Sequence, residues 1–305
     1  MTGKQVKRVK TISEFHKLKG FPPPQHPLIS LVEYDIQCGT KANIFNLVFD
    51  FYHISVRRME NGKLIYGQQD YDFDNGVMYF VAPNQVTGIE PEKNQKMKES
   101  GWTLLIHPDF LWNTPLAKTI KQYEYFDYSV NEALFLSEKE ELTLKGIIGN
   151  IQQEYNASID KFSQSIISSH LEALLNYSER FYQRQFITRK ITHHQILERL
   201  ENLLSDYFNG SDLATKGLPT VQYISDQLNI SPTYLRSLLK ALTGLNTQQH
   251  IHEKLIGKAK EKLSTTSLSI SEIAYELGFE HPQSFSKLFK TKTNLAPLEF
   301  RQSFN

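Results

Sequence analysis

Two short segments near the end of the chain, 221–230 and 271–279, carry apolar residues three or four positions apart with polar residues between them. This spacing predicts an amphipathic helix in each segment. Each helix is followed by an asparagine or a glycine, the residues that most readily adopt a positive φ. A proline then stands at the first turn of a second predicted helix, Pro232 in one case and Pro282 in the other. The order of helix, turn and helix is typical of a helix-turn-helix unit.

The same pattern occurs twice in register. Residues 231–245 align with residues 281–295 at a constant offset of 50 positions, and their prolines, lysines, threonines and final leucines coincide. A self-similarity of this kind indicates one supersecondary unit used twice. Two helical hairpins that pack only for stability are the alternative interpretation. Polar residues at the start of each second helix favour DNA recognition instead.

In a helix-turn-helix unit the second helix enters the major groove with its N-terminal side chains against the base edges. The candidate base-contacting residues are Thr233, Arg236 and Ser237 in the first copy and Gln283, Ser284 and Lys287 in the second. Lys240 and Lys290 follow on the same faces as candidate phosphate contacts. The leucines and phenylalanines between them fall on the opposite side and are expected to pack inward.

A longer helix is predicted over 247–263, between the two copies. Lys254, Lys258 and Lys262 recur along it at i, i+4 and i+8, which places three positive charges on one face, where they could bind phosphates without selecting sequence. The whole chain has a net charge of only +1. From residue 213 onward, 11 lysines and arginines stand against 7 acidic residues, a net charge of +4, whereas residues 1–212 carry 23 against 26, or −3. The basic surplus therefore lies in the part predicted to bind DNA.

The segments 268–279, 285–290 and 297–301 together resemble the signature of the AraC/XylS family of bacterial transcription regulators. The resemblance covers about residues 195–305 and implies a DNA-binding domain of two helix-turn-helix units held by a connecting helix. Three positions depart from the usual pattern of that family. His281 replaces an acidic residue and predicts a weaker N-cap, Asn294 replaces a glycine but can adopt the same left-handed conformation, and Leu255 replaces an arginine.

The first half of the chain has the pattern of β-strands. Residues 43–56 place Phe45, Leu47, Phe49, Phe51 and His53 on one face by strict alternation. Further strands are predicted at 63–66, 77–82 and 102–106. Short strands at this spacing favour a small antiparallel barrel or sandwich.

Residues 72–83 resemble the cupin-like sensor domain that often precedes this DNA-binding module. Cupin enzymes hold a metal with a His-x-His pair, a nearby glutamate and a distant histidine, and the strand region has no His-x-His. We therefore expect no metal, no cofactor and no catalytic residue. The competing class is a cupin-like small-molecule-binding or enzymatic protein whose helical C-terminal domain is structural.

The predicted barrel has two possible uses. It could bind a small organic effector, in a pocket walled by Phe49, Phe51, His53, Tyr79 and Trp102. Arg57 or Arg58 could then hold an anionic group, although adjacent strand residues point to opposite faces. Alternatively, these aromatic residues are ordinary core and the barrel serves only to assemble the regulator.

Two helices are predicted between the halves. Ser137 and Glu140 form a capping box that starts the first helix. The second begins near Asp160 and carries an apolar stripe at alternating four- and three-residue steps. The stripe consists of Ile167, Leu171, Leu174 and Phe181, together with Ser178. It is either intramolecular core or the best candidate for a dimer interface.

Cys38 is the single cysteine, which excludes a disulfide framework, and no stretch has the length of a membrane span. The N-terminus lacks the apolar run of a secretory signal. These features predict a cytoplasmic protein of mixed α+β class with three parts, 1–136, 137–194 and 195–305. We expect a homodimeric transcription regulator that binds double-stranded DNA and contacts RNA polymerase, an activator by analogy with the family.

Overall fold

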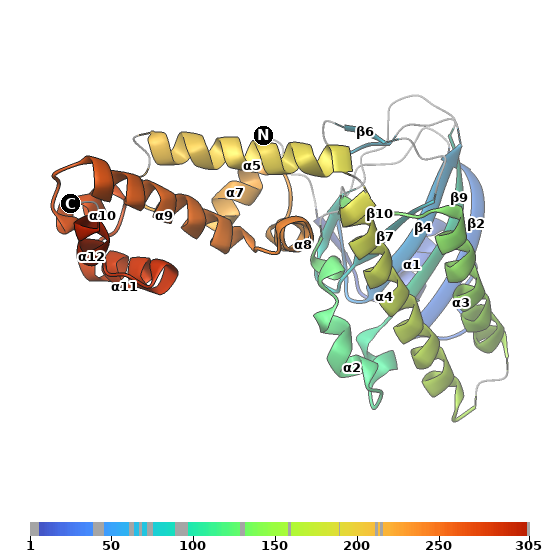
Figure 1. Cartoon of the computed structure of the whole chain (residues 1–305). Helices are drawn as coiled ribbons and strands as arrows, with labels where there is room; N and C mark the ends of the chain where they lie inside the picture. The colour runs from blue at the N-terminus through green and yellow to red at the C-terminus, as the bar shows by residue number, and fades with distance from the viewer. Residues whose placement is uncertain are drawn as a thin grey trace. The chain divides into compact units, whose positions relative to one another are not determined.

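A computed structural model describes residues 6–38, 46–60, 64–66, 69–71, 76–88, 97–128, 132–157, 160–188, 190–210, 213 and 216–303. The chain divides into two compact units, Met1–Gln185 and Phe186–Asn305, called here the first and the second unit. The first unit combines β-sheets with helices, whereas the described secondary-structure elements of the second unit are all helices (Figure 1).

The described strands of the first unit form three sheets. A five-stranded sheet has the order β10-β7-β4-β9-β2, a three-stranded sheet has the order β1-β3-β8, and β5 pairs with β6. The strands are β1 (Val6–Val9), β2 (Ile29–Cys38), β3 (Asn46–Phe49), β4 (Tyr52–Glu60), β5 (Leu64–Tyr66), β6 (Gln69–Tyr71), β7 (Val77–Val81), β8 (Val86–Gly88), β9 (Met97–Ile106) and β10 (Leu134–Phe135).

The expected closed antiparallel barrel is wrong for the described strands. The single strand predicted over 43–56 breaks at residues 50–51, where the Asp50 amide donates to the carbonyl of Val9 at 3.2 Å. β3 therefore joins one sheet and β4 another, and β3 pairs in parallel with β1. Residues 43–45 lie outside the described residues.

The other predicted strands are present with shifted ends. β7 stops at Val81, and β9 begins at Met97 rather than at 102. Residue 63, and residues 72–75 of the segment that resembles a cupin, lie outside the described residues. The sequence pattern does not predict β1, β2, β6, β8 or β10.

Helices and short 3-10 helices complete the first unit. They are α1 (Ile12–Lys19), η1 (Pro108–Leu111), α2 (Leu116–Thr119), η2 (Ile120–Gln122), η3 (Glu124–Asp127), α3 (Glu138–Asn156) and α4 (Ser163–Thr188). The predicted capping box of α3 is confirmed, because the Ser137 amide donates to Glu140 and the Glu140 amide to the Ser137 hydroxyl. Arg184 on α4 binds both carboxylate oxygens of Glu140, at 2.8 and 2.9 Å, and so joins the two helices.

The apolar stripe of α4 packs inside this unit. Ile167, Leu171, Leu174 and Phe181 are all at least nine-tenths buried. Nearby, the Ser178 hydroxyl contacts the Met78 sulfur on β7 at 3.8 Å, and the Tyr182 ring lies 6.3 Å from that of Phe80. The four stripe residues therefore do not form a surface for a second chain here. Periodicity predicted the buried face of the helix but could not identify the sheet that covers it.

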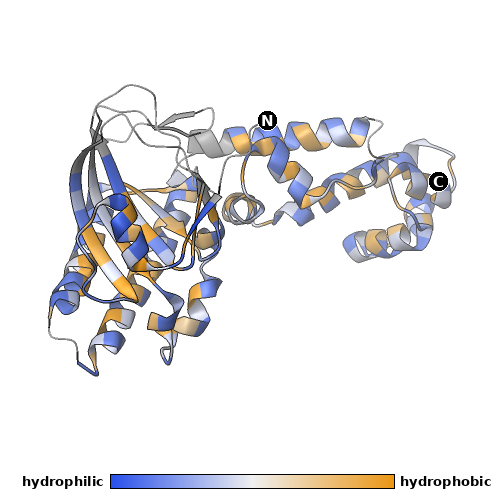
Figure 2. Ribbon diagram, turned by 180° about the vertical axis from the view of Figure 1, so that it is seen from behind, coloured by the Kyte–Doolittle hydropathy of each residue, from blue (hydrophilic) through white to orange (hydrophobic). Residues whose placement is uncertain are grey.

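The described part of the second unit contains seven helices. They are α5 (Lys190–Asn209), α7 (Val221–Leu228), α8 (Pro232–Thr243), α9 (Thr247–Thr265), α10 (Ile270–Glu276), α11 (Pro282–Thr293) and α12 (Pro297–Gln302). Hydrophobic and hydrophilic residues alternate along them, as expected of amphipathic helices (Figure 2). One continuous cluster of buried side chains runs from Leu200 on α5 through Leu255 on α9 to Phe289 on α11. Both helix pairs therefore share a single core.

Candidate nucleic-acid interface

The first helix pair is α7 and α8. Thr220 caps α7, and Asn229 ends it in the left-handed conformation at φ 57°. The Ile230 amide then donates back to the carbonyl of Ser225 at 3.1 Å, which closes the turn. Ser231 caps α8 by accepting from the Tyr234 amide at 3.2 Å, with Pro232 at the first position of the helix. The local signals in the sequence therefore fix both helix ends.

The second pair, α10 and α11, repeats this construction with a longer turn. Gly278 takes the left-handed place at φ 78°, and the Phe279 amide donates to the Ala274 carbonyl at 3.0 Å. A Cβ at Gly278 would lie 2.7 Å from the carbonyl oxygen of Leu213, so this turn requires glycine for space as well as for φ. His281 makes no capping bond to α11, and Asn294 ends that helix at φ 61°. The structural expectations for His281 and Asn294 are both confirmed.

The two pairs bury equivalent positions. Ile224, Leu228, Leu235 and Leu239 in the first pair, and Ile273, Leu277, Phe285 and Phe289 in the second, are at most 4 % exposed. Leu255, the residue that replaces an arginine of the family pattern, is also fully buried in α9. The apolar faces thus hold each pair against the shared core and leave the opposite faces outward.

The predicted base-contacting residues lie away from this core. Arg236 and Lys240 on α8 are exposed, while Thr233 and Ser237 are half-buried. On α11, Gln283, Ser284, Lys287 and Lys290 are all exposed. Each second helix therefore presents a polar face that begins in its first turns.

Two of the three candidate phosphate-binding lysines on α9 form ion pairs with glutamates. Lys258 lies 2.9 Å from Glu261, and Lys262 lies 2.6 Å from Glu276 on α10. Both pairs are partly exposed to solvent, and such pairs contribute only about 0–1 kcal/mol. A phosphate could therefore displace the carboxylates, but these two lysines are less available than their spacing suggested. Lys254 is half-buried.

Lys292 is a basic residue of α11 that the sequence analysis did not single out. Lys292, in the last turn of α11, is exposed, and its charge acts together with burial to lower the pKa of His252 on α9. Burial is the larger cause. Lys292 extends the basic positions Lys287 and Lys290 of α11 toward the C-terminal end of that helix. The clustering of three lysines within six residues was the signal that could have identified it.

The residues proposed for an effector pocket are only partly brought together. The His53 ring lies 5.5 Å from that of Phe49 and 5.6 Å from that of Tyr79, and the Phe49 and Phe51 rings are 5.3 Å apart. Trp102 does not join them. It pairs with Val56 on β4, and side chains alternate along a strand, so Trp102 lies on the sheet face opposite His53.

His53 is fully buried among these rings, and neither of its ring nitrogens has a hydrogen-bond partner among the described residues. Burial, with smaller contributions from the charges of Arg57 and Lys19, lowers its pKa to about 3. Arg57 lies over the Tyr79 ring at 5.0 Å, whereas Arg58 pairs with Glu141 on α3. The two arginines therefore point to opposite faces of the sheet, as expected.

The residues that the structure describes contain neither a metal site nor a membrane-spanning helix. No three His, Cys, Asp or Glu side chains within those ranges come together as a metal site. Within the same ranges, no helix combines the length and the apolar character needed to cross a bilayer.

The helix pairs, their left-handed turns and their outward polar faces define a helix-turn-helix domain. The helix-turn-helix domain family matches residues 224–303. The HTH-type transcriptional activator RhaS of Escherichia coli is 34% identical over 79 residues, which cover 26% of this chain and 28% of RhaS. The C-terminal part of the chain is thus an AraC-type helix-turn-helix domain, and the sequence resemblance is confirmed for these residues.

The chain is also similar to other proteins, some of them over a larger share of its length. Histidine kinase P4 of Formosa agariphila is 27% identical over 46% of this chain and 10% of its own length. The chain thus spans about a tenth of that kinase and 28% of RhaS. The C-terminal domain of the response regulator yesN from Fusobacterium nucleatum is 30% identical, covers 34% of this chain and 95% of that domain, and has a TM-score of 0.30. ToxT from Vibrio cholerae is 15% identical, covers 90% and 98% of the two chains, and has a TM-score of 0.30.

Proposed function

We propose that this protein is a sequence-specific transcription regulator that reads two adjacent major-groove segments of double-stranded DNA, one with α8 and one with α11. The observation that carries the proposal is the repeated arrangement of a buried apolar face and an outward polar face on these two helices. Residues 195–305 would form the DNA-binding part. Residues 1–136, with the helices of 137–194, would form the part that senses a signal or assembles the regulator.

The shared core supports the reading of two segments by one chain. Helices that are held by one core keep a fixed spacing, and α9, with 19 residues, is about 28 Å long. Successive major-groove segments on one face of the duplex lie roughly 34 Å apart. Since α8 and α11 flank the ends of α9 in sequence, this spacing is within their reach.

The proposed role is activation, with RNA polymerase as a partner, because the relative RhaS is named as a transcriptional activator. A homodimer stays part of the proposal, but its interface would use surfaces other than the buried stripe of α4. Leu142 on α3, 68% exposed, and Tyr177 on α4, 38% exposed, offer apolar area on the outer faces of those helices.

A small organic effector of the first unit is the remaining element of the proposal. The unpaired nitrogens of His53 support it, because a buried polar group without a partner costs about 1–3 kcal/mol. An effector with one hydrogen-bonding group near this ring would recover that cost. The same aromatic cluster could equally be structural core, in which case the first unit acts only in assembly.

The DNA proposal is tested by selecting binding sites for the whole chain from a random duplex library at fixed salt concentration. Arg236 has the donor geometry to bind guanine and Gln283 to bind adenine, and each bidentate contact contributes about 1–3 kcal/mol of discrimination. Arg236→Ala and Gln283→Ala should therefore relax the base preference at two different positions of the selected site. Gln153→Ala, an exposed change on α3, is the matched control and should leave the preference unchanged.

Two results would count against this function. If both variants kept the wild-type preference at every position, α8 and α11 would not be the recognition helices. If the library yielded no preferred sequence at all, the alternative of a small-molecule-binding or enzymatic protein with a structural helical domain would be favoured.

A further inference from the structure

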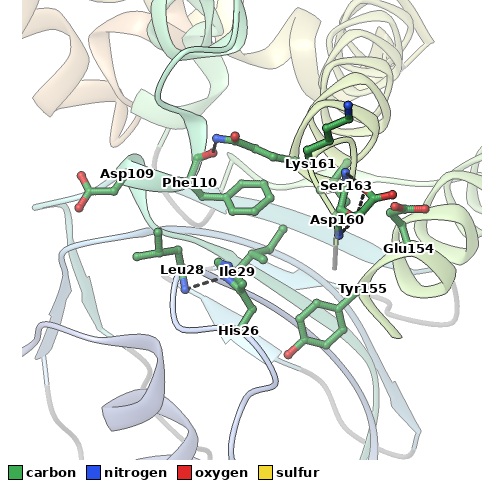
Figure 3. Close-up of a pocket in the computed structure, with 12 residues that line it drawn as sticks. His26, Leu28, Ile29, Asp109, Phe110, Glu154, Tyr155, Asp160, Lys161 and Ser163 are labelled. Atoms are coloured by element: carbon green, nitrogen blue, oxygen red, sulfur yellow. Dashed lines mark hydrogen bonds between the residues drawn. The ribbon is translucent and has the colours of Figure 1, made fainter. Parts of the chain in front are cut away.

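The first unit contains a cavity of about 320 Å³. Its lining includes Ile167 of the α4 stripe but no candidate DNA contact and no residue of the His53 cluster. Its walls come from the segment before β2, from η1, from the end of α3 and from the start of α4 (Figure 3). The volume is at the lower end of the range for small-molecule sites. Only a ligand of about the size of one substituted ring or a short chain would fit.

The body of the cavity is apolar and held in place. The rings of Phe110 and Tyr155 line it together with Leu28 and Ile29. The Tyr155 hydroxyl accepts a bond from the Gln25 amide at 2.8 Å, and the Phe110 carbonyl accepts one from the Gln164 side chain at 2.6 Å. Both aromatic walls are therefore positioned before any ligand enters, which lowers the entropic cost of binding.

Two carboxylates lie beside the turn from α3 to α4. Asp160 accepts bonds from the amides of Phe162 and Ser163 at 2.7 and 3.0 Å, and these bonds lower its pKa and keep it ionised. Glu154 also lines the cavity, and its carboxylate has no hydrogen bond or ion pair to any residue in the described part of the chain. At this end of the cavity one carboxylate is thus held by hydrogen bonds from Phe162 and Ser163, whereas the other has no partner within the described ranges.

The neighbouring basic groups do not neutralise that charge. The Lys161 ammonium lies over the Phe162 ring at 4.9 Å and points away from Phe110 and Tyr155 in Figure 3. His26 accepts a bond from the Leu28 amide through Nδ1 at 3.1 Å, which places its proton on Nε2, and burial lowers its pKa. His26 is consequently a neutral donor at pH 7.

These observations select the chemistry of the ligand. An anion would meet two carboxylates, and a metal ion would find too few ligands, because His26, Glu154 and Asp160 do not come together as a metal-binding group. We propose that this cavity binds a small organic amine, with its ammonium group at Glu154 and Asp160 and its apolar or aromatic body between Phe110 and Tyr155. The proposal goes beyond the DNA-binding function and does not depend on it.

The test measures binding of 2-phenylethylamine to the whole chain by isothermal titration calorimetry at pH 7. We expect saturable binding at one site. Because a hydrogen bond between two charged groups is stronger than one with a neutral partner, and a carboxylate would be repelled, 2-phenylethanol and phenylacetate should bind at least about tenfold more weakly than the amine. The three probes share the same ring and differ in the charge of the end group.

Two variants remove the charge at the site, and one removes it elsewhere. Glu154→Gln and Asp160→Ser should each weaken amine binding at least about tenfold, and serine at 160 keeps a side-chain oxygen to cap α4. Glu172→Gln, an exposed change on α4, should leave binding unchanged. Absence of saturable amine binding, equal binding of the alcohol, or equal loss in the Glu172→Gln control would overturn the proposal. Tighter binding of phenylacetate would overturn it as well.

Discussion

At the scale of single residues, the burial of His53 makes the free energy of unfolding depend on pH. It is buried against the rings of Phe15, Phe49 and Tyr79, and its pKa in the folded chain is about 3. In the unfolded chain a histidine titrates near 6.5. Between these two values the unfolded state binds a proton that the folded state does not, so acid favours unfolding.

The sign and size of this effect follow from proton linkage. The stability that neutral His53 contributes is fully present above about pH 6.5 and is lost as the pH falls toward 3, by up to about 1.4 kcal/mol per pH unit. From pH 7 to pH 5 the free energy of unfolding of the first unit should therefore fall by about 2 kcal/mol through this residue. Both tryptophans, Trp102 and Trp112, lie in this unit, so their fluorescence during urea unfolding of the whole chain measures it.

The matched variants separate His53 from other titrating groups. His53→Leu should remove most of this dependence between pH 5 and 7, whereas His170→Leu, on the partly exposed side of α4, should retain it. An equal fall in the free energy of unfolding of wild type and His53→Leu over that interval would contradict the prediction. It would mean that His53 becomes protonated in the folded chain and that its burial does not lower its pKa.

At the scale of elements, α7 and α10 are the first helices of the two pairs and differ at one buried position. Ser225 on α7 and Ala274 on α10 hold equivalent positions before the turn, and both are fully buried. The Ser225 hydroxyl has no hydrogen-bond partner within the described residues. A buried hydroxyl without a partner is destabilising, so the first pair carries a cost that the second lacks.

Exchanging these two residues tests their equivalence. Ser225→Ala should raise the free energy of unfolding of the second unit by about 1 kcal/mol, and Ala274→Ser should lower it by a similar amount. Urea unfolding of the whole chain followed by far-UV circular dichroism gives the values, with tryptophan fluorescence marking the transition of the first unit. Destabilisation by both changes would mean that the Ser225 hydroxyl does find a partner and that the two helices are not equivalent here.

The sequence predicted elements well where local signals define them. Pro232, Pro282, Asn229 and Asn294 mark helix ends through φ and N–H chemistry that act within a few residues, and each takes the expected conformation. Strands were predicted less well, because the break after Phe49 depends on Val9, forty residues away. No pattern in 43–56 contains that contact.

The candidate pocket residues were also predicted well where they are close in sequence and poorly where their position depends on strand pairing. Phe49, Phe51 and His53 do cluster, as alternation grouped them, although the break in the chain places Phe49 and His53 in different sheets. Trp102 was placed with them without a known register, and its pairing with Val56 puts it on the other face. The cavity beside Phe110 and Tyr155 was not predicted, because its walls come from four segments that have no common motif.

At the scale of the whole molecule, the proposed function depends on two recognition helices that are similar in construction and different in chemistry. α8 presents Thr233, Arg236 and Ser237, whereas α11 presents Gln283, Ser284 and Lys287. One chain should therefore read an asymmetric site made of two unlike boxes about 10–10.5 base pairs apart. The shared core makes that spacing rigid.

The most direct test of this proposal inserts five base pairs between the two boxes of the selected site and measures the affinity of the whole chain at constant salt concentration. Half a helical turn places the boxes on opposite faces of the duplex, so affinity should fall at least about 100-fold, toward nonspecific binding. Replacing five base pairs between the boxes without changing the length is the control and should have little effect unless it alters DNA bending. Unchanged affinity after the insertion would contradict the proposal, because it would mean that only one of the two helix pairs reads DNA.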